Sequence, residues 1–357
     1  MKKEGLRILL LADAGSFHTE RFAHQLKSQG CRVLTASLEE GRMRRVRLRR
    51  LGPVKSFHYL LAVPQVKRII KRFRPDVINA HYASGYGFIA ARAVGKEGPP
   101  IVLNLWGSDV LVVPHRSAQH RMKVRMALEG ADCVVGDSRY LVESAKDVGR
   151  IRRSEVIAWG IERKFMSKHK ACYDLGKPLR IITPRTHEEI YDNGFILDSL
   201  KAMVAAGEIT LTFPDFGSLA ARFKDQAGKL LDHGVQLYTK MGRSEFLSFF
   251  AEHDVCLSAS RSDSTPASLV EAMALGLIPV AARTPGVAEW LTTETGFTFE
   301  PDNAGELCGI IRKFTSSSDT LEAMRRRNLQ RVEREAIFEQ NVAQQLGIMT
   351  ELAGGSA

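Results

Sequence analysis

The chain is organised around the segment Ser258 to Trp290, which has the sequence SASRSDSTPASLVEAMALGLIPVAARTPGVAEW. It starts at the end of an apolar strand that begins at Asp254, and after a polar turn it enters a helix. Thr265 can serve as the N-cap of that helix, Pro266 fits its first position and Gly276 follows its last turn. Because unpaired amides and the helix dipole attract anions, we expect the start of this helix to bind an anion such as a diphosphate.

Two carboxylates flank the expected anion site. Asp263 stands just before the helix and Glu271 lies inside it. A carboxylate is costly to bury without a partner, so neither residue is suited to a purely apolar core. Both are therefore candidates for binding a polar ligand.

Strands and helices alternate along the whole chain. We predict strands at 7–12, 32–37, 77–80, 101–105, 133–136 and 156–158, and then at 180–183, 210–213, 235–238, 254–258, 278–281 and 296–299. These are short continuous apolar runs, as expected for parallel strands that helices cover on both faces. The predicted fold class is therefore α/β, with two Rossmann-like domains that face each other across a cleft.

The same pattern divides the chain into four parts. The first series of strands and helices covers residues 1–164, and a polar linker covers 165–178. The second series covers 179–333, and residues 334–357 form a final helix. One arrangement open to this helix is packing back toward the N-terminal domain.

Length and composition are those of a water-soluble protein. The chain has 357 residues, 44% of them hydrophobic, and no apolar run reaches the roughly 18 residues of a membrane span. Its start lacks a signal-peptide cleavage pattern, so we expect a cytoplasmic protein, with the inner face of the cytoplasmic membrane as one location. The five cysteines include no C-x-x-C pair, so neither a disulfide framework nor a metal site is expected.

The positive charge lies mainly in the first domain. The net charge is +11, and residues 1–164 contain 31 Lys and Arg against 15 Asp and Glu. Much of this excess falls between Arg42 and Arg74, where RMRRVRLRR and VKRIIKRFR mix basic and apolar residues. This stretch is either a solvated surface or a contact with anionic lipid or an anionic acceptor. It shows no aromatic platform and no recognition-helix motif, so we do not expect nucleic acid as a partner.

Common nucleotide motifs are missing from the sequence. The first strand–helix turn, DAGSFH, contains one glycine instead of G-x-G-x-x-G, and no G-x-x-x-x-G-K-[ST] occurs. We therefore expect no NAD, FAD or other cofactor.

The pattern S-x-S-D-S-T-P-x-S-L-V-E-A-M-A-L-G-x-I-P-V, followed by P-G-V-x-E-W and T-G-F, resembles the donor-binding region of the retaining glycosyltransferases of family 4, which have the GT-B fold. The segments DVINAH, WGSDV, CVVGDS and VIAWGI fall where such enzymes have counterparts. The resemblance implies an acceptor-binding N-terminal domain and a C-terminal domain that binds a nucleotide sugar.

The resemblance also implies roles for single residues. Glu271 would accept hydrogen bonds from the ribose, Asp263 would hold a hydroxyl of the transferred sugar, and Arg185 would neutralise the departing diphosphate. The expected donor-binding residues are Arg185, Asn193, Asp263, Ser264, Thr265, Pro266, Ser268, Leu269 and Glu271.

The sequence departs from the family pattern at several positions. The first carboxylate is Asp263 instead of Glu, and the place of the usual lysine is near Asn193. The glycine pair of the first loop is reduced to Gly15, and Trp106 stands where a histidine is often found. These changes put the sugar and the rate of transfer in question.

Loops at the carboxyl ends of parallel strands are the expected acceptor site. The residues we assign to it are Gly15, Ser16, His18, His81, Trp106, Asp109, His115 and Arg116. We assign catalytic roles to Asp263, Arg185, Asp109 and His18. The alternatives are that Trp106 packs in the core, that Asp109 caps a turn and that the single histidines are structural.

We expect a retaining glycosyltransferase that moves a sugar from a nucleotide diphosphate sugar, most commonly UDP-linked, to a glycolipid or polysaccharide-precursor acceptor. The resemblance implies that the departing diphosphate helps to deprotonate the incoming hydroxyl. The chain contains no D-x-D motif, which favours transfer without a metal ion. Two alternatives stay open: a GT-B nucleotide-sugar epimerase, and a non-catalytic protein that binds nucleotide sugars.

Overall fold

The computed structural model describes residues 5–41, 43–50, 55–95, 97–168, 175–314 and 319–354. The chain forms two compact units, Met1–Ala158 with Glu339–Ala357, and Trp159–Phe338. It therefore passes from the first unit to the second after Ala158 and returns after Phe338. The expected boundaries at 164 and 333 both lie within the second unit.

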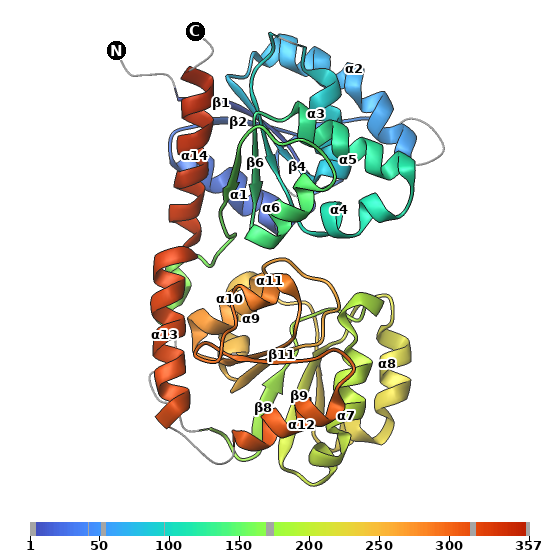
Figure 1. The fold of residues 1–357 in the computed structure, drawn as a ribbon, viewed down its shortest axis with the longest axis vertical. Coiled ribbons are helices and arrows are strands. Elements are labelled where there is room, and N and C mark those ends of the chain that lie inside the picture. Colours follow the sequence, from blue (N-terminus) through green and yellow to red (C-terminus); the bar gives the residue numbers. More distant parts are fainter. Residues whose placement is uncertain are drawn as a thin grey trace. The chain divides into compact units, whose positions relative to one another are not determined.

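Within the described residues, the first unit has a seven-stranded parallel sheet in the order β3-β2-β1-β4-β5-β6-β7 (Figure 1). The strands are β1 (Arg7–Leu11), β2 (Arg32–Ser37), β3 (Val46–Arg47), β4 (Val77–His81), β5 (Ile101–Asn104), β6 (Cys133–Gly136) and β7 (Ser154–Val156). All residues of β4, β5 and β6 are buried, as the continuous apolar runs predicted.

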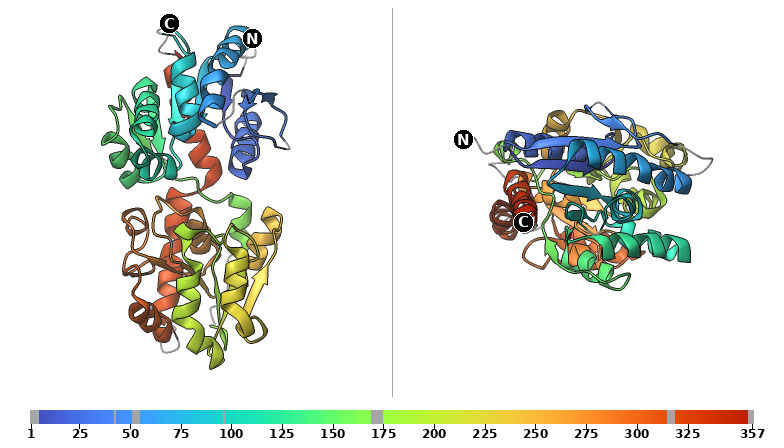
Figure 2. Two further views of the ribbon diagram at one scale, coloured as in Figure 1. Left: turned by 90° about the vertical axis from the view of Figure 1, so that its right-hand side faces the viewer. Right: turned by 90° about the horizontal axis from the view of Figure 1, so that it is seen from above.

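Helices cover this sheet, and α2 packs on α3, which packs on α5 (Figures 1 and 2). The helices of the first unit are α1 (Phe17–Ser28), α2 (Lys55–Phe73), α3 (Phe88–Ala93), α4 (Ser108–Leu111), α5 (Ala118–Gly130), α6 (Arg139–Lys146) and α14 (Phe338–Gly354). The C-terminal helix α14 thus groups with the N-terminal sequence from Glu339 onward.

The second unit has a six-stranded parallel sheet within its described residues, in the order β10-β9-β8-β11-β12-β13. Its strands are β8 (Leu179–Ile182), β9 (Ile209–Pro214), β10 (Val235–Tyr238), β11 (Val255–Ser258), β12 (Ile278–Ala282) and β13 (Phe297–Phe299). Its helices are α7 (Asn193–Ala205), α8 (Ala220–Ala227), α9 (Arg243–Ala251), α10 (Ala267–Leu275), α11 (Pro285–Ala288), α12 (Ala304–Lys313) and α13 (Asp319–Glu335).

Helix α10 is the most buried helix near the expected donor site. Every residue from Leu269 to Leu275 is buried, because α10 packs on β12 and between α9 and α13. Apart from Ser268 and Glu271 its residues are apolar, and such a helix is stable only where it is buried. Burial of α10 fixes the position of its N-terminus relative to the sheet.

Two local features differ from the sequence-based expectation. The short strand β3 pairs with β2 inside the basic stretch, where no strand was predicted. The sequence also predicts a helix over residues 219–231, but helix α8 ends at Ala227, because Gly228 adopts a φ of +48° and a 3₁₀ segment, Gly228–Asp232, follows. Glycine takes this left-handed conformation without a steric penalty.

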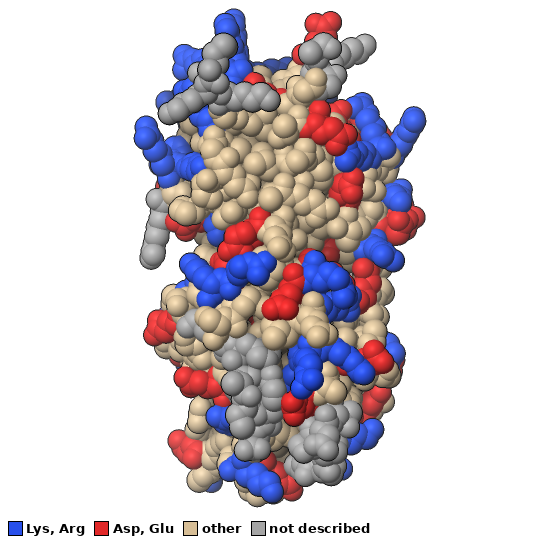
Figure 3. All heavy atoms as spheres, turned by 90° about the vertical axis from the view of Figure 1, so that its left-hand side faces the viewer, with Lys and Arg blue, Asp and Glu red and all other residues tan. Residues whose placement is uncertain are grey.

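Helix α13 has a mixed-charge surface. Arg326 pairs with Glu322 and Arg331 pairs with Glu335, each one helical turn apart. Figure 3 shows basic and acidic side chains beside each other on the face that it displays. The exposed pair of Arg326 and Glu322 contributes about 0.3–0.5 kcal/mol. Arg331 is only 22% exposed and also donates to the carbonyl oxygens of Glu289 and Trp290. None of the helices in the described part of the chain has both the length and the low charge needed to cross a membrane.

Candidate active site

The start of α10 is held in place by contacts from α11 and from Trp290, which follows α11. Helix α10 begins at Ala267 with Pro266 as the N-cap residue, so the predicted N-cap, Thr265, is one position too early. The Thr265 hydroxyl instead accepts a hydrogen bond of 3.0 Å from the indole nitrogen of Trp290. Gly286 passes so close that an added Cβ would lie 2.1 Å from the Ser264 carbonyl oxygen. The other end is as predicted, because Gly276 ends the helix with a φ of +84°.

Arg185 and Asp263 meet beside this helix start. A guanidinium nitrogen of Arg185 lies 2.5 Å from Asp263 Oδ2, and the two side chains are only 16% and 14% exposed. The Arg185 guanidinium also lies over the ring of Tyr191, 4.2 Å from its centroid. Burial raises the pKa of Asp263, while Arg185 and hydrogen bonds involving Ser260 and Ser264 oppose this effect. The two residues expected to act on the donor are therefore already neighbours.

Glu271 lies on α10 and pairs with an arginine that the sequence did not single out. Arg243 Nη1 is 2.6 Å from Glu271 Oε1, and Arg243 Nη2 is 3.1 Å from Glu162 Oε2. Glu271, Glu162 and Arg243 are all largely buried, with side-chain exposures of 6%, 11% and 17%. No local motif could have identified Arg243, because 28 residues separate it from Glu271 and 81 from Glu162.

Asn193, which stands near the position of the family lysine, supports the loop that carries Arg185. Its side chain is buried and donates a 2.9 Å hydrogen bond to the Arg185 carbonyl oxygen. It also lies 3.1 Å from His187 Nδ1, and its carbonyl accepts from the Thr183 hydroxyl at 3.3 Å. Through these hydrogen bonds the side-chain amide of Asn193 holds the loop from β8 to α7 in place.

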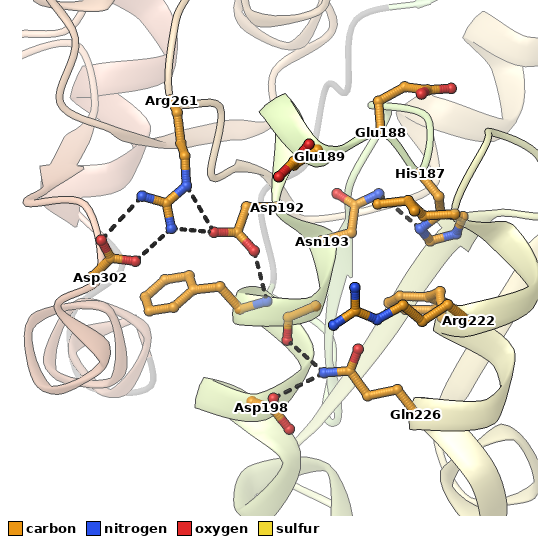
Figure 4. Close-up of a pocket in the computed structure, with 14 residues that line it drawn as sticks. His187, Glu188, Glu189, Asp192, Asn193, Asp198, Arg222, Gln226, Arg261 and Asp302 are labelled. Carbon is orange, nitrogen blue, oxygen red and sulfur yellow. Dashed lines mark hydrogen bonds and ion pairs between the residues drawn. The ribbon is translucent and has the colours of Figure 1, made fainter.

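A polar cavity of about 400 Å³ lies next to this loop. Figure 4 shows Arg261 between Asp192 and Asp302, to which it bonds at 2.6 Å each, and His187 beside Asn193. Neither Asp263 nor Glu271 lines this cavity. The Arg261 pairs tie the turn before α10 to the start of α7, and so they help to fix the loop around Asp263.

An aromatic cluster forms in the first unit where acceptor contacts were expected. The ring of Trp106 lies 5.5 Å from those of His18 and His81, and it stacks on Tyr82 at 5.3 Å. Gly15 and Ser16 precede His18 in the sequence and lie just before α1. The Gly15 amide donates a hydrogen bond of 2.8 Å to Asp13 Oδ1. Trp106 is partly exposed, so its ring can contribute to a surface that binds a sugar.

Asp109 and His81 are buried below this cluster. Asp109 accepts hydrogen bonds from the amides of Ala83 at 2.7 Å and Trp106 at 3.0 Å. It is completely buried, and burial raises its pKa to about 6 against the lowering effect of these amides. Burial lowers the pKa of His81 to about 3. The geometry gives both residues a clear supporting role beneath Trp106.

A chain of buried hydrogen bonds runs from His81 to the C-terminal helix. His81 Nε2 lies 3.0 Å from Asn79 Oδ1, Asn79 donates to Asn104 at 3.2 Å, and Asn104 donates to Gln345 on α14 at 2.8 Å. All four side chains are at most 3% exposed. The amide directions make His81 the donor at Nε2 in its neutral form.

His115 and Arg116, also expected to contact the acceptor, are exposed at the end of a 3₁₀ segment, Val113–His115. In the described residues, no group of three or more His, Cys, Asp or Glu side chains gathers as metal ligands would.

The sequence matches two family models. Residues 7–138 match the model described as Glycosyl transferase 4-like, and residues 198–331 match Glycosyl transferases group 1. An uncharacterized glycosyltransferase of Methanocaldococcus jannaschii is 24% identical over 298 residues, which are 82% of each chain. TuaC of Bacillus subtilis, assigned to teichuronic acid biosynthesis, is 26% identical over 256 residues, which are 67% of this chain and 61% of TuaC.

Solved structures share the fold. A sucrose-phosphate synthase from Thermosynechococcus elongatus superimposes with a TM-score of 0.82 at 14% identity, over 98% of this chain and 100% of the synthase. Anabaena HepE, solved in complex with UDP, superimposes with a TM-score of 0.78 at 17% identity, over 97% of this chain and 100% of HepE.

Proposed function

Because the chain belongs to the family 4 (group 1) glycosyltransferases and has the GT-B fold, we propose that it transfers a sugar from a nucleotide diphosphate sugar to a hydroxyl acceptor with retention of configuration. One observation carries this proposal most directly: Arg185 and Asp263 meet at the start of the buried helix α10. The first amides of a helix have no intrahelical partner and can donate to a ligand. The site therefore combines amide donors from α10 with the guanidinium of Arg185 and the carboxylate of Asp263.

These groups match the charge that develops during transfer. Breaking the bond between the sugar and the diphosphate places negative charge on the departing phosphate. Arg185 and the amides of Ala267 and Ser268, the first two residues of α10, would stabilise that charge, which is commonly the largest catalytic contribution. Asp263 would hold a hydroxyl of the sugar, and Glu271 would accept hydrogen bonds from the ribose.

We further propose UDP-linked sugars as donors and a glycolipid or polysaccharide precursor as acceptor. The solved complexes of HepE with UDP and with UDP-glucose support the first choice. The assignment of TuaC to teichuronic acid biosynthesis supports the second. His18 and Trp106, together with the exposed His115 and Arg116, would contact the acceptor.

Transfer would need no metal ion and no cofactor. The positive charge of Arg185 and the amides at the start of α10 would balance the diphosphate, and the sequence contains no D-x-D motif. The departing phosphate would take the proton of the incoming hydroxyl on the same face of the sugar. Addition of EDTA should therefore leave the rate unchanged, and a loss that Mg²⁺ or Mn²⁺ restores would contradict this point.

A basic surface on α2 favours contact with the cytoplasmic face of an anionic membrane. Lys67, Arg68, Lys71 and Arg72 are exposed, and within the described residues none of them forms an ion pair. Leu60 and Leu61 are also exposed on this helix, by 46% and 37%. Arg42 and residues 51–54 of the basic stretch lie outside the described residues. Sedimentation with liposomes should show binding that requires anionic lipid and weakens with salt.

The deciding experiment is turnover with a panel of nucleotide sugars and a bacterial lipid extract. We expect nucleotide diphosphate release that depends on the acceptor, and NMR of the product should show a retained anomeric configuration. Isomerised donor without acceptor would instead indicate an epimerase. Donor binding without any release would indicate a non-catalytic nucleotide-sugar-binding protein.

A further inference from the structure

We propose that Arg243 is a positioning residue that joins the ribose-binding carboxylate Glu271 to the segment where the chain enters the second unit. The proposal rests on the proposed function, because it takes Glu271 as the ribose contact.

The geometry of Arg243 is that of a buried bridge. Arg243 is the first residue of α9, and its two terminal nitrogens point to different carboxylates, Glu271 at 2.6 Å and Glu162 at 3.1 Å. Its guanidinium also lies 5.8 Å from the ring centroid of Phe165. Burial acts to lower the pKa of Arg243, but the two carboxylates raise it above its ordinary value. The arginine therefore stays charged while serving two acidic partners.

Loss of the arginine would leave both carboxylates without their positively charged partner. With side-chain exposures of 6% and 11%, Glu271 and Glu162 are poorly solvated, and one positive charge is shared between two negative charges. Removing one partner of a buried ion pair is strongly unfavourable because an uncompensated charge stays behind. Arg243 thus determines where the Glu271 carboxylate lies.

Glu162 belongs to a point where two distant parts of the chain are joined. The preceding residue, Ile161, donates from its amide to the Ala336 carbonyl at 3.0 Å, and its carbonyl accepts from the Phe338 amide at 2.9 Å. Gly160 has a φ of +67°, and an added Cβ would lie 2.3 Å from the Ala336 carbonyl oxygen. The chain enters the second unit at Trp159 and leaves it after Phe338. The entering and leaving segments are therefore hydrogen-bonded to each other here.

Nucleotide binding should therefore be coupled to this crossing segment, residues 159–165 and 336–338. Ribose hydroxyls that donate to Glu271 would need the carboxylate in the position that Arg243 sets through Oε1, and Glu162 in turn holds Arg243. Coupling between binding sites is reciprocal, so loss of the Glu162 charge must in turn weaken nucleotide binding.

The test compares Arg243→Met and Glu162→Gln with the wild-type protein. Calorimetry with UDP, GDP and ADP first identifies the nucleotide that binds the wild-type protein most tightly. We expect Arg243→Met to weaken that binding about tenfold or more, and Glu162→Gln about two- to fivefold. Arg243→Lys, which keeps the charge but not the two-pronged geometry, should fall between Arg243→Met and the wild type.

Hydrogen exchange of the crossing segment separates coupling from a general loss of structure. In the wild-type protein the nucleotide should slow exchange in this segment. In Arg243→Met a saturating nucleotide should still protect the start of α10 but no longer the crossing segment. Arg326→Met and Glu322→Gln, which break an exposed pair in the same unit, are matched controls that should behave like the wild type.

Two results would count against the proposal in different ways. If Arg243→Met binds the nucleotide like the wild type and the crossing segment is still protected, the coupling through Arg243 is refuted. If the wild-type protein binds none of the three nucleotides, the proposed function itself fails and the inference fails with it.

Discussion

Arg185 and Asp263 form an ion pair with each other at 2.5 Å, at the place where a donor's diphosphate and sugar are proposed to bind. The pair keeps both side chains oriented while no donor occupies the site. A donor that binds here must share or replace this interaction. Each residue therefore affects the position and charge of the other.

Asp263→Asn should lower kcat far more than it weakens UDP binding. The variant frees Arg185 from its partner, which leaves the diphosphate contact intact, but it removes the carboxylate that holds the transferred sugar. We expect kcat to fall by about 10²-fold or more, as when one transition-state contact is lost. Steady-state kinetics and UDP calorimetry together measure this. A parallel loss of UDP affinity would show that Asp263 mainly orders the diphosphate site.

Restoring the lysine of the family at position 193 should not improve the enzyme. Asn193 is buried and its amide holds the carbonyl of Arg185 and the ring of His187. Asn193→Lys would place a charge in this space and break the bonds, so the melting temperature should fall and activity should drop. Differential scanning fluorimetry and turnover rates test this, and a gain in kcat would refute it.

Gln345→Met should destabilise the first unit. It leaves the Asn104 amide buried without its acceptor, which costs about 1–3 kcal/mol of unfolding free energy. The neighbouring Gln344 is exposed on the same helix, so Gln344→Met is the matched control and should change little. Urea denaturation compares the two. Equal stability of both variants would show that the hydrogen-bond chain contributes nothing.

His81 should make the protein less stable in acid. Its pKa is lowered to about 3 in the folded protein, against about 6.5 in an unfolded chain, so the unfolded state takes up a proton first. The stabilising contribution is complete above about pH 6.5 and declines as the pH falls toward 3. His81→Gln should reduce the slope of unfolding free energy between pH 6.5 and 5. An unchanged slope would mean that the imidazole does not titrate as its burial requires.

Asp109 should affect stability with the opposite pH dependence to His81, and over a narrower pH range. Its pKa is raised to about 6, against about 3.9 when unfolded, so its neutral form favours the folded state. Its contribution is complete below about pH 4 and is lost as the pH rises to 6. Unfolding measured between pH 4 and 6 should therefore show this loss in the His81→Gln background.

The order of strands and helices could be predicted because each buried parallel strand is a continuous apolar run with turns at its ends. Strands β2, β6 and β10 have the predicted bounds, and the exceptions are local, such as the helix that Gly228 ends early. The family and the GT-B fold could also be predicted, because the pattern from Asp263 to Gly296 contains the residues that carry the resemblance.

Contacts between distant residues could not be predicted. Arg243 and Glu162 have no motif of their own, and only the folded chain brings them to Glu271. The direction in which a side chain at the end of a strand points also cannot be predicted from the sequence. The sequence predicts His81 and Asp109 as acceptor contacts from such positions, whereas the structure buries both beneath Trp106, in contact with neighbouring protein groups.

The hydrogen bond between Asn104 and Gln345 also has a consequence for the order of synthesis. During translation, all of the first unit's strands leave the ribosome before any residue of α14 is made. The Asn104 amide therefore lacks its Gln345 partner until the whole second unit has been produced. The unit that begins first is completed last, and a chain truncated after residue 338 would contain all residues of the second unit but lack the part of the first unit that α14 supplies.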